Sequence, residues 1–436
     1  MMPTENPGSL GILLQEQGGL FSGTVSSHTN GDEPRMTLER VGLGDVGVLW
    51  PEIAKRGNAG KSVHGAGAGL SYEEALIPAL AEGLERYSTC VFRSEQFVWA
   101  AAGELGIGAL DLDTVPRCSV TELAHPKCPL ILPDKTKPIR WVRGLSALDG
   151  SVKYIPVVMV YSHAGFAVSG ERFWISISTG CAAHVSYESA LFAGICEVIE
   201  RDAISIVWLQ KLALPRIELD CLPPPLPAYW RRYENASADV EYLFFDATSD
   251  LGVPTVYGLQ LAMHNSRVTT LVSCGTGTSI PVALAKVIRD MAAIRCTFPR
   301  AISVPTEWDS FTDVMHGATY MASADRLGAF DFLTKTKATK RISEIVTDRS
   351  SQVTLQSLVD TLKRLRLETY IVDLTTDEAI RAGMRVLRVI IPGLQPLSFR
   401  YRARYLGHPR LYEAPLRMGY PAHPENQLND WPQPFA

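Results

Sequence analysis

Four glutamates stand in two closely similar segments of the sequence, at a spacing that could support chemistry. Glu82 and Glu85 lie three residues apart, and so do Glu197 and Glu200. Residues three apart on a helix are neighbours on its surface. Four carboxylates from two helices offer the oxygen ligands that Mg²⁺ prefers, and Mg²⁺ usually binds together with substrate phosphates. The spacing therefore predicts a Mg²⁺ site that serves a nucleotide rather than a general acid/base pair.

Each glutamate pair is followed by an arginine and preceded by a glycine-rich segment. Arg86 and Arg201 could contact phosphate or neutralise the acids. The glycine-rich segments cover residues 65–69 and 179–183, and we interpret both as turns. Neither is a P-loop, because the Gly-Lys-Ser/Thr sequence is missing. Together with the acids, these segments suit a nucleotide.

The two segments form an internal repeat. Residues 71–87 align with residues 186–202 without a gap, from Ser-Tyr-Glu at the start to Glu-x-x-Glu-Arg at the end. A fainter third copy begins at Ser279 and has Asp290 where the first acid would fall. Two good copies do not make a solenoid. The repeat instead indicates similar loop–helix units that face a common site.

The two predicted helices differ in how strongly they indicate a site. On the first helix alone, the acids could simply form a solvated face. The second helix is apolar around nearly its whole circumference, which is typical of a buried helix. Glu197 and Glu200 would then lie in or beside the core, where a carboxylate needs a metal, an arginine or a proton.

Helical and strand patterns alternate along the chain, so the fold class is mixed α/β or α+β. We predict helices over about 72–90, 187–210, 281–296, 354–367 and 376–383. Strands are predicted over 153–160, 240–245, 253–257, 269–273, 369–372 and 386–391. Residues 1–35 are rich in Gly, Ser, Thr and Asn and are predicted to form a flexible arm, with one large domain over 36–436.

Composition excludes several classes of protein. The 436 residues carry a net charge of -4, so no basic excess supports non-specific nucleic-acid binding. No apolar run approaches the roughly 18 residues of a membrane span, and the N-terminus lacks a secretory signal pattern. Eight cysteines contain no Cys-x-x-Cys pair. Reduced, buried thiols in a cytoplasmic protein are the simplest interpretation.

Several segments resemble the signatures of the YcaO family. Residues 67–88 resemble the first signature and residues 178–203 the second, which is long and specific. Residues 275–295 resemble the third more weakly, and residues 391–411 resemble the C-terminal region. The resemblance covers about residues 40–436 and implies a single large YcaO-type domain around a nucleotide site.

The resemblance implies an ATP-dependent enzyme that activates backbone amides of ribosomally made peptides. In the azoline-forming branch, a Cys, Ser or Thr side chain of the substrate attacks the preceding carbonyl. ATP then phosphorylates the resulting oxygen, and phosphate leaves to give a thiazoline or oxazoline. Family members hold Mg²⁺-ATP between carboxylates, which here would be Glu82, Glu85, Glu197 and Glu200. The predicted nucleotide contacts are those four glutamates with Arg86, Glu188, Arg201 and Arg295.

The last residues also resemble the azoline-forming branch, whose members end in Pro-x-Pro-x-Pro. Pro432 and Pro434 match that tail, and Ala436 replaces its last proline. The resemblance implies that these three residues reach the active site and act in catalysis. An ordinary disordered, proline-rich end is the alternative.

The resemblance further implies partners. Because the YcaO-like region fills the chain, we expect a separate ThiF-like subunit to bind the leader of the precursor peptide. A flavin-dependent azoline dehydrogenase is an optional further partner, and we expect a homo- or hetero-oligomer. Departures from the family pattern leave two alternatives open: thioamide or macroamidine formation, and a catalytically degenerate scaffold subunit. The departures stand at Ala68, Val185, Ser189, Ile280 and Ala293.

Overall fold

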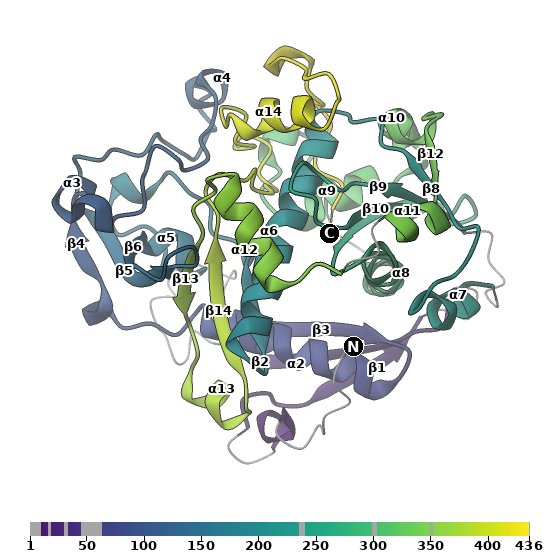
Figure 1. Ribbon diagram of the computed structural model, residues 1–436, viewed down its shortest axis with the longest axis horizontal. Coiled ribbons are helices and arrows are strands. Elements are labelled where there is room, and N and C mark those ends of the chain that lie inside the picture. Colours follow the sequence, from purple (N-terminus) through teal and green to yellow (C-terminus); the bar gives the residue numbers. More distant parts are fainter. Residues whose placement is uncertain are drawn as a thin grey trace.

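The structure, a computed structural model, combines three β-sheets with helices that pack between and around them (Figure 1). It describes residues 10–15, 19–29, 34–44, 63–234, 240–298, 303–348 and 352–435. The predicted mixed class of helices and strands is confirmed. No helix in these ranges combines the length and the apolar character that crossing a bilayer requires.

The six-stranded sheet joins segments that are far apart in the sequence. Its strands run in the order β4-β5-β13-β14-β7, and β6 pairs with β5. All of these pairings are antiparallel. The strands are β4 (Val98–Ala100), β5 (Ile139–Ser146), β6 (Val152–Pro156), β7 (Cys181–His184), β13 (Tyr370–Asp373) and β14 (Arg385–Ile390).

The five-stranded sheet lies on the opposite side of the molecule, to the right in Figure 1. Its order is β11-β10-β9-β8-β12, and only the β8–β12 pair is parallel. The strands are β8 (Arg216–Glu218), β9 (Glu241–Asp246), β10 (Thr255–Leu261), β11 (Thr270–Thr276) and β12 (Thr339–Arg341).

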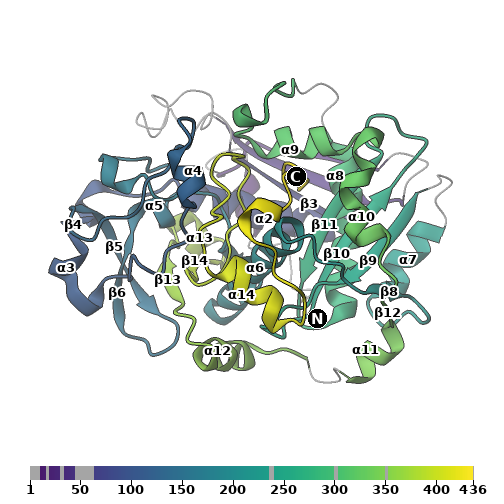
Figure 2. The same cartoon turned by 90° about the horizontal axis from the view of Figure 1, so that it is seen from above.

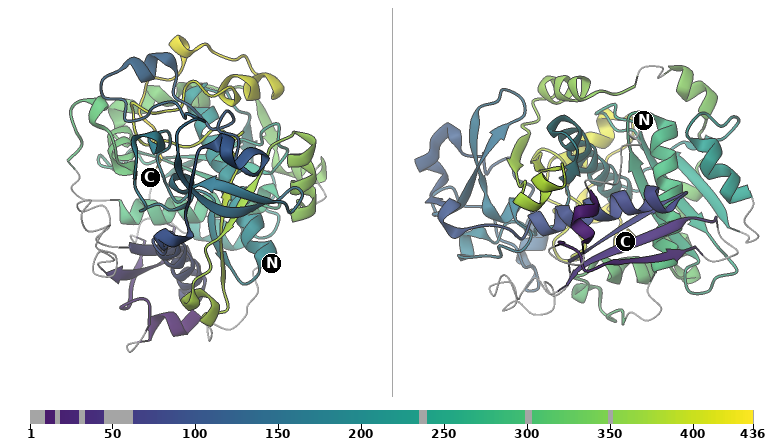
Figure 3. Two further views of the ribbon diagram at one scale, coloured as in Figure 1. Left: turned by 90° about the vertical axis from the view of Figure 1, so that its left-hand side faces the viewer. Right: turned by 90° about the horizontal axis from the view of Figure 1, so that it is seen from below.

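The third sheet consists of β1 (Thr24–His28), β2 (Thr37–Gly44) and β3 (Val63–Gly69), with helix α2 (Tyr72–Ser88) against it (Figure 3). Strand β1 pairs with β2 in full register, so the prediction of a flexible arm over residues 1–35 does not hold for this strand. Residues 1–9 of that arm lie outside the described ranges.

The glycine-rich segment 65–69 belongs to strand β3 and is not the predicted turn. A Cβ at Gly65 would stand 2.1 Å from the Ala79 carbonyl oxygen, and one at Gly67 would stand 2.1 Å from that of Ala75. Glycine usually weakens a strand, but it also marks close approach of another backbone. These glycines therefore let α2 lie directly on the strand.

The predicted helices are confirmed, with ends that differ by a few residues. They are α2, α6 (Tyr187–Leu209), α8 (Ile280–Thr297), α12 (Leu355–Arg364) and α13 (Asp377–Arg381). Ser71 and Ser186 cap the two repeat helices, because their side chains accept hydrogen bonds from the Glu74 and Ser189 amides. Helix α6 is buried over most of its length, as its apolar circumference predicts.

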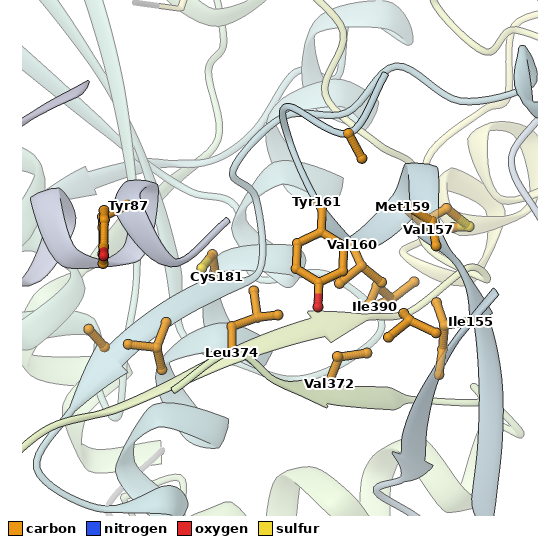
Figure 4. Close-up of a cluster of buried hydrophobic side chains, with 14 of the residues drawn as sticks. Tyr87, Ile155, Val157, Met159, Val160, Tyr161, Cys181, Val372, Leu374 and Ile390 are labelled. Carbon is orange, nitrogen blue, oxygen red and sulfur yellow. The ribbon is translucent and has the colours of Figure 1, made fainter. Parts of the chain in front are cut away.

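The predicted strand over 153–160 is correct only as far as Pro156. Residues Val157–Val160 form a short helix, α5, although valine favours strands. All four side chains of α5 are almost fully buried, so packing in the core overrides the local preference. Figure 4 shows Val157, Met159 and Val160 among side chains from β14 and β13.

Three strand–helix units close into a ring. Helix α2 packs on β3 and β7, α6 packs on β7 and β11, and α8 packs on β11 and β3. Each helix thus contacts its own preceding strand and the strand of the next unit. Helices α2, α6 and α8 gather near the centre of the molecule in Figure 2. The weak third copy in the sequence therefore has the same local structure as the other two.

A buried ionic network fastens α6 to the C-terminal region. Arg410, at the start of α14 (Arg410–Arg417), contacts Asp202 of α6 at 2.8 Å and Asp250 at 2.7 Å. Asp202 also accepts a hydrogen bond from the backbone N–H of Gln395 at 2.7 Å. The side chains of Arg410 and Asp202 are 4% and 0% exposed. Losing one partner would leave the other charges buried without compensation.

We expect Arg410→Met to lower the free energy of unfolding by about 3–5 kcal/mol, because buried Asp202 would lose its cation and buried Asp250 would lose the closer of its two. Urea unfolding followed by circular dichroism measures the loss. Arg417→Met is the matched control on the same helix: its side chain is half exposed and approaches Asp250 only to 3.6 Å, so the loss should stay below about 1 kcal/mol. Equal losses in the two variants would contradict this account.

Candidate active site

The two repeat units place one glutamate and one arginine in the same geometry. In α2, the Arg86 guanidinium contacts Glu82 at 2.8 Å, one helical turn away. In α6, the Arg201 guanidinium contacts Glu197 at 3.3 Å, again one turn away. The arginine that follows each acid pair is therefore bonded to the first acid of the pair.

The first glutamate of each pair also binds the backbone of its own unit. One Glu82 oxygen accepts the Ala66 amide of β3 at 2.6 Å. One Glu197 oxygen accepts the Gly180 amide, just before β7, at 2.9 Å. The glycine-rich segments therefore hold these carboxylates in place.

The second glutamate of each pair binds the backbone of the next unit. Glu85 accepts the Ala183 amide of β7 at 2.8 Å, and Glu200 accepts the Thr276 amide of β11 at 2.8 Å. The glutamates thus connect unit one to unit two and unit two to unit three. We call Glu82, Glu85, Glu197 and Glu200 the glutamate cluster.

The third unit contributes a lysine to the glutamate cluster, and the sequence motifs did not indicate this residue. Lys286 of α8 contacts Glu200 at 2.5 Å, and Arg201 approaches the other Glu200 oxygen at 3.6 Å. The Glu200 side chain is only 3% exposed, so these two cations balance a buried charge. Lys286 stands one turn before Asp290, the acid noted in the third copy. This spacing of four residues from the acid of the third copy could have identified Lys286 from the sequence.

Glu85 is the member of the cluster with the most perturbed electrostatics. Burial raises its pKa well above the ordinary value, and the nearby carboxylates of Glu197 and Glu82 raise the pKa further. The Ala183 amide and the Arg86 charge act in the opposite direction but do not compensate. A carboxylate in this position would be stabilised by an additional cation.

The cluster suits Mg²⁺ that shares its ligands with phosphate. Its free donor atoms are carboxylate oxygens, the type that Mg²⁺ prefers, and mutual repulsion raises the pKa of Glu85. Over the described ranges, no three His, Cys, Asp or Glu side chains are gathered into a complete metal site. Mg²⁺ usually binds through one or two carboxylates and completes its shell with water and substrate phosphates. Glu197 is the carboxylate whose charge raises the pKa of Glu85 most.

Two predicted nucleotide contacts are not brought to the cluster. Glu188 is exposed in the first turn of α6, about 14 Å along the helix axis from Glu197. Arg295 is buried near the end of α8, where it donates to the Gln260 side chain and to the Val268 carbonyl oxygen. The prediction that Glu188 and Arg295 contact the nucleotide therefore rests only on the resemblance to the family.

The C-terminal tail packs into the protein. Pro432 and Pro434 are buried, and the Trp208 indole of α6 donates to the Trp431 carbonyl oxygen at 3.1 Å. The Phe435 ring lies 5.5 Å from the ring of Tyr257 in an edge-to-face arrangement. This contact is inconsistent with a disordered end for the described part of the tail. Ala436 itself lies outside the described residues.

The tail ends close to the glutamate cluster. Tyr257 pairs with Cys274 across strands β10 and β11. Burial raises the pKa of the Cys274 thiol, and the negative charge of Glu200 raises it further. Phe435 therefore contacts Tyr257, the cross-strand neighbour of Cys274, and the Cys274 thiol lies close enough to Glu200 for that carboxylate to raise its pKa.

Comparison with known proteins assigns the chain to a family. Residues 66–395 match the family model described as YcaO cyclodehydratase, which binds ATP and Mg²⁺. The match covers most of the chain, so this protein belongs to the YcaO family. ATP and Mg²⁺ are therefore the cofactors of this family.

Three relatives show how far the similarity extends. An uncharacterised protein of Methanothermobacter thermautotrophicus (strain Delta H) is 27% identical over 372 residues, which are 83% of this chain and 88% of that protein. A heterocyclase solved with substrate and cofactor has a TM-score of 0.78 at 22% identity and covers 98% of this chain. YcaO from Methanopyrus kandleri, bound to AMPPCP and Mg²⁺, has a TM-score of 0.58 at 18% identity, with 85% of each chain covered.

At these identities the solved structures establish the fold. The chain spans only 56% of the length of the heterocyclase chain described above. The single large YcaO-type domain predicted from the sequence is therefore found in the structural neighbours, and the fold class is confirmed.

We expect Glu85→Gln to raise the free energy of unfolding of the metal-free protein at neutral pH. The folded pKa of Glu85 lies above the unfolded value, so the wild-type protein loses stability as pH rises through that interval. Each pKa unit corresponds to about 1.4 kcal/mol. Glutamine keeps the oxygen that accepts the Ala183 amide.

Urea unfolding in EDTA at pH 7.5 and at pH 4 tests this expectation. The gain should vanish below about pH 4.3, the ordinary pKa of a glutamate. The exposed Glu95→Gln serves as control and should change stability at neither pH. A stability loss in Glu85→Gln at pH 7.5 would show that burial and the neighbouring carboxylates do not destabilise the ionised Glu85 side chain.

Proposed function

We propose that this protein is an ATP-dependent cyclodehydratase subunit that forms thiazoline or oxazoline rings in a ribosomally made precursor peptide. The glutamate cluster is the main support for this proposal. Each of its carboxylates accepts a hydrogen bond from a backbone amide, and Glu85 is both buried and repelled by its neighbours. The family match supports ATP and Mg²⁺ as its ligands.

In this proposal, Mg²⁺-ATP supplies the phosphoryl group that converts an amide oxygen into a leaving group. Glu85 and Glu197 hold the metal, and the other two glutamates complete the anionic wall. Arg86 and Arg201 are held by Glu82 and Glu197 and offset negative charge that develops on phosphate. Lys286 adds a third cation through its contact with Glu200.

The reaction consumes one ATP and releases ADP and phosphate for each ring. A substrate thiol or hydroxyl adds to the preceding amide carbon, and its proton is lost. The amide oxygen takes the phosphoryl group from ATP and leaves as phosphate, the amide nitrogen loses its proton, and the ring C=N bond forms. The protein needs no nucleophile of its own, so its work is to position the peptide and stabilise charge.

Partners and location belong to the same proposal. A precursor peptide and a separate leader-binding subunit would act with this chain, in an oligomer in the cytoplasm. The heterocyclase structure described above was solved in complex with substrate, which supports a peptide-binding role for the fold.

We expect Glu197→Gln and Glu200→Gln each to weaken Mg²⁺-ATP binding at least about tenfold, because each removes a charge that holds the metal or the cations. Isothermal titration calorimetry measures the dissociation constant, and Glu95→Gln should leave it unchanged. A wild-type chain that binds no nucleotide, even with its partner subunit present, would favour the scaffold alternative.

We expect the wild-type chain, with ATP, Mg²⁺ and its partner subunit, to remove one water per modified residue from a precursor peptide. The peptide to test is a short Cys/Ser/Thr-rich one encoded beside the gene, and mass spectrometry measures the change. Mass gain that depends on added sulfide would instead indicate thioamide formation.

Pro432, Pro434 and Ala436 are proposed to guide the peptide to the phosphoryl group. We expect Phe435→Ala, which releases the tail from Tyr257, to lower ring formation about tenfold or more while Mg²⁺-ATP affinity stays the same. Phe435→Leu keeps an apolar contact and should retain most activity. A parallel loss of nucleotide affinity would place the tail in the nucleotide site instead.

A further inference from the structure

Trp431, at the start of the C-terminal tail, lies among aromatic rings that come from distant parts of the chain. Its ring centroid is 5.5 Å from that of Trp308 in η7 (Trp308–Ser310) and 6.4 Å from that of Tyr320 in α9 (Val314–Met321). The rings of Trp308 and Tyr320 contact each other edge to face at 5.9 Å. The Arg326 guanidinium lies 4.6 Å from the Tyr320 ring centroid and 6.0 Å from that of Trp431. We call Trp308, Tyr320, Arg326 and Trp431 the aromatic box.

Hydrogen bonds hold the backbone of the same segment. The Asn429 N–H donates to the Leu209 carbonyl oxygen at the end of α6 at 2.8 Å, and the Asn429 carbonyl oxygen accepts from Arg404 at 2.9 Å. The Trp431 N–H donates to the Asn429 side chain at 3.1 Å, and the Trp431 carbonyl oxygen accepts from the Trp208 indole. Because the N–H and the carbonyl of both residues are engaged, the chain leaves the aromatic box in a fixed direction.

Gly317 of α9 supplies the surface on which the next part of the tail lies. A Cβ at this position would stand 2.2 Å from the Gln433 carbonyl oxygen, closer than any side-chain carbon can lie. Helix α9 itself does not require glycine here, because Gly317 has no positive φ and alanine is the better helix former. The close approach of the tail therefore explains the glycine.

The direction set at the aromatic box is carried to the end of the described chain. Four residues after Trp431, the Phe435 ring contacts Tyr257. Four residues span at most about 14 Å, so the two contacts leave little slack between them. Pro432 and Pro434 lie in this interval, and each fixes its own φ. The tail therefore behaves as a stiff link between the aromatic box and Tyr257.

We propose that the aromatic box and Gly317 form an anchor that aims the C-terminal tail at the glutamate cluster. Trp431 and Gly317 are positioning residues, because they act through the tail and set the direction in which the last residues lead. This inference rests on the proposed function, in which the tail guides the peptide, and it adds the device that holds the tail in place.

Substitution of Gly317 tests the anchor without ATP or a precursor. Tryptophan fluorinated on the indole ring gives one fluorine NMR resonance for each of the eight tryptophans of the full chain, and Trp431→Phe identifies that of Trp431. We expect Gly317→Ala to shift this resonance toward its position in the unfolded chain, because the methyl group displaces Gln433. Gly103→Ala in α3 (Ala102–Leu105) is the control: its Cβ meets nothing within 4 Å, so the resonance should stay in place. An unchanged Trp431 resonance in Gly317→Ala would overturn the proposal.

Kinetics of ring formation test what the anchor does. We expect Gly317→Ala and Trp431→Ala to lower kcat about tenfold while the Mg²⁺-ATP dissociation constant stays the same, because only the position of the tail changes. Trp431→Phe keeps an aromatic ring in the box and should retain most activity. A parallel loss of nucleotide affinity, or equal losses in Trp431→Phe and Trp431→Ala, would overturn the positioning role.

Thermal unfolding of Gly317→Ala separates this role from a general loss of structure. The midpoint should stay near that of the wild type, because alanine favours α9. Ring formation at the wild-type rate in a Gly317→Ala chain with a displaced Trp431 would overturn the proposal. A wild-type chain that forms no rings would contradict the proposed function, while the Trp431 resonance still decides whether the box holds the tail.

Discussion

Carboxylates that are held among neighbouring elements must find hydrogen-bond donors, and this requirement shapes the centre of the protein. Each of the four glutamates takes one donor from a backbone amide, at Ala66, Ala183, Gly180 or Thr276. Backbone amides cannot move independently of their strands. The carboxylates can therefore hold their positions only if β3, β7 and β11 are correctly placed around the helices.

This requirement explains why the repeat units are coupled in a ring. The first acid of each pair binds its own unit and the second binds the following unit, while α2, α6 and α8 each pack on two strands. A displacement of one helix would break hydrogen bonds in two units. The arrangement gives a rigid support for charge, which is what stabilisation of a phosphoryl group requires.

Burial sets the electrostatic balance of the same region. Glu200 is nearly inaccessible and is paired with Lys286 and Arg201, whereas Glu85 has repulsive neighbours that raise its pKa. The charge of Glu200 is thus neutralised by cations of the protein itself, whereas an added cation would stabilise the ionised form of Glu85. Arg201 also lines a small pocket together with Arg388, so this arginine joins the cluster to the packing between α6 and β14.

Much of the fold could be predicted because it depends on local patterns. Hydrophobic periodicity predicted α2, α6 and α8, and the expected starts of the two repeat helices at residues 72 and 187 agree with the structure. Local patterns failed where close packing prevailed. The glycines of β3 look like a turn but allow a helix to lie on a strand, and the valines of α5 look like a strand but fill the core as a helical turn.

By itself, the sequence determined the residue types of the site: two acid pairs, their arginines and the repeat that relates them. Helical spacing is a local property, so the i, i+4 bonds of Arg86 and Arg201 follow directly from it. Only the tertiary structure decided that Lys286 completes the charge balance, that Glu188 and Arg295 lie elsewhere, and that Trp308, Tyr320 and Trp431 meet in one aromatic box. Those relations join residues distant in sequence, and the physical reason is that only chain packing sets the distances between them.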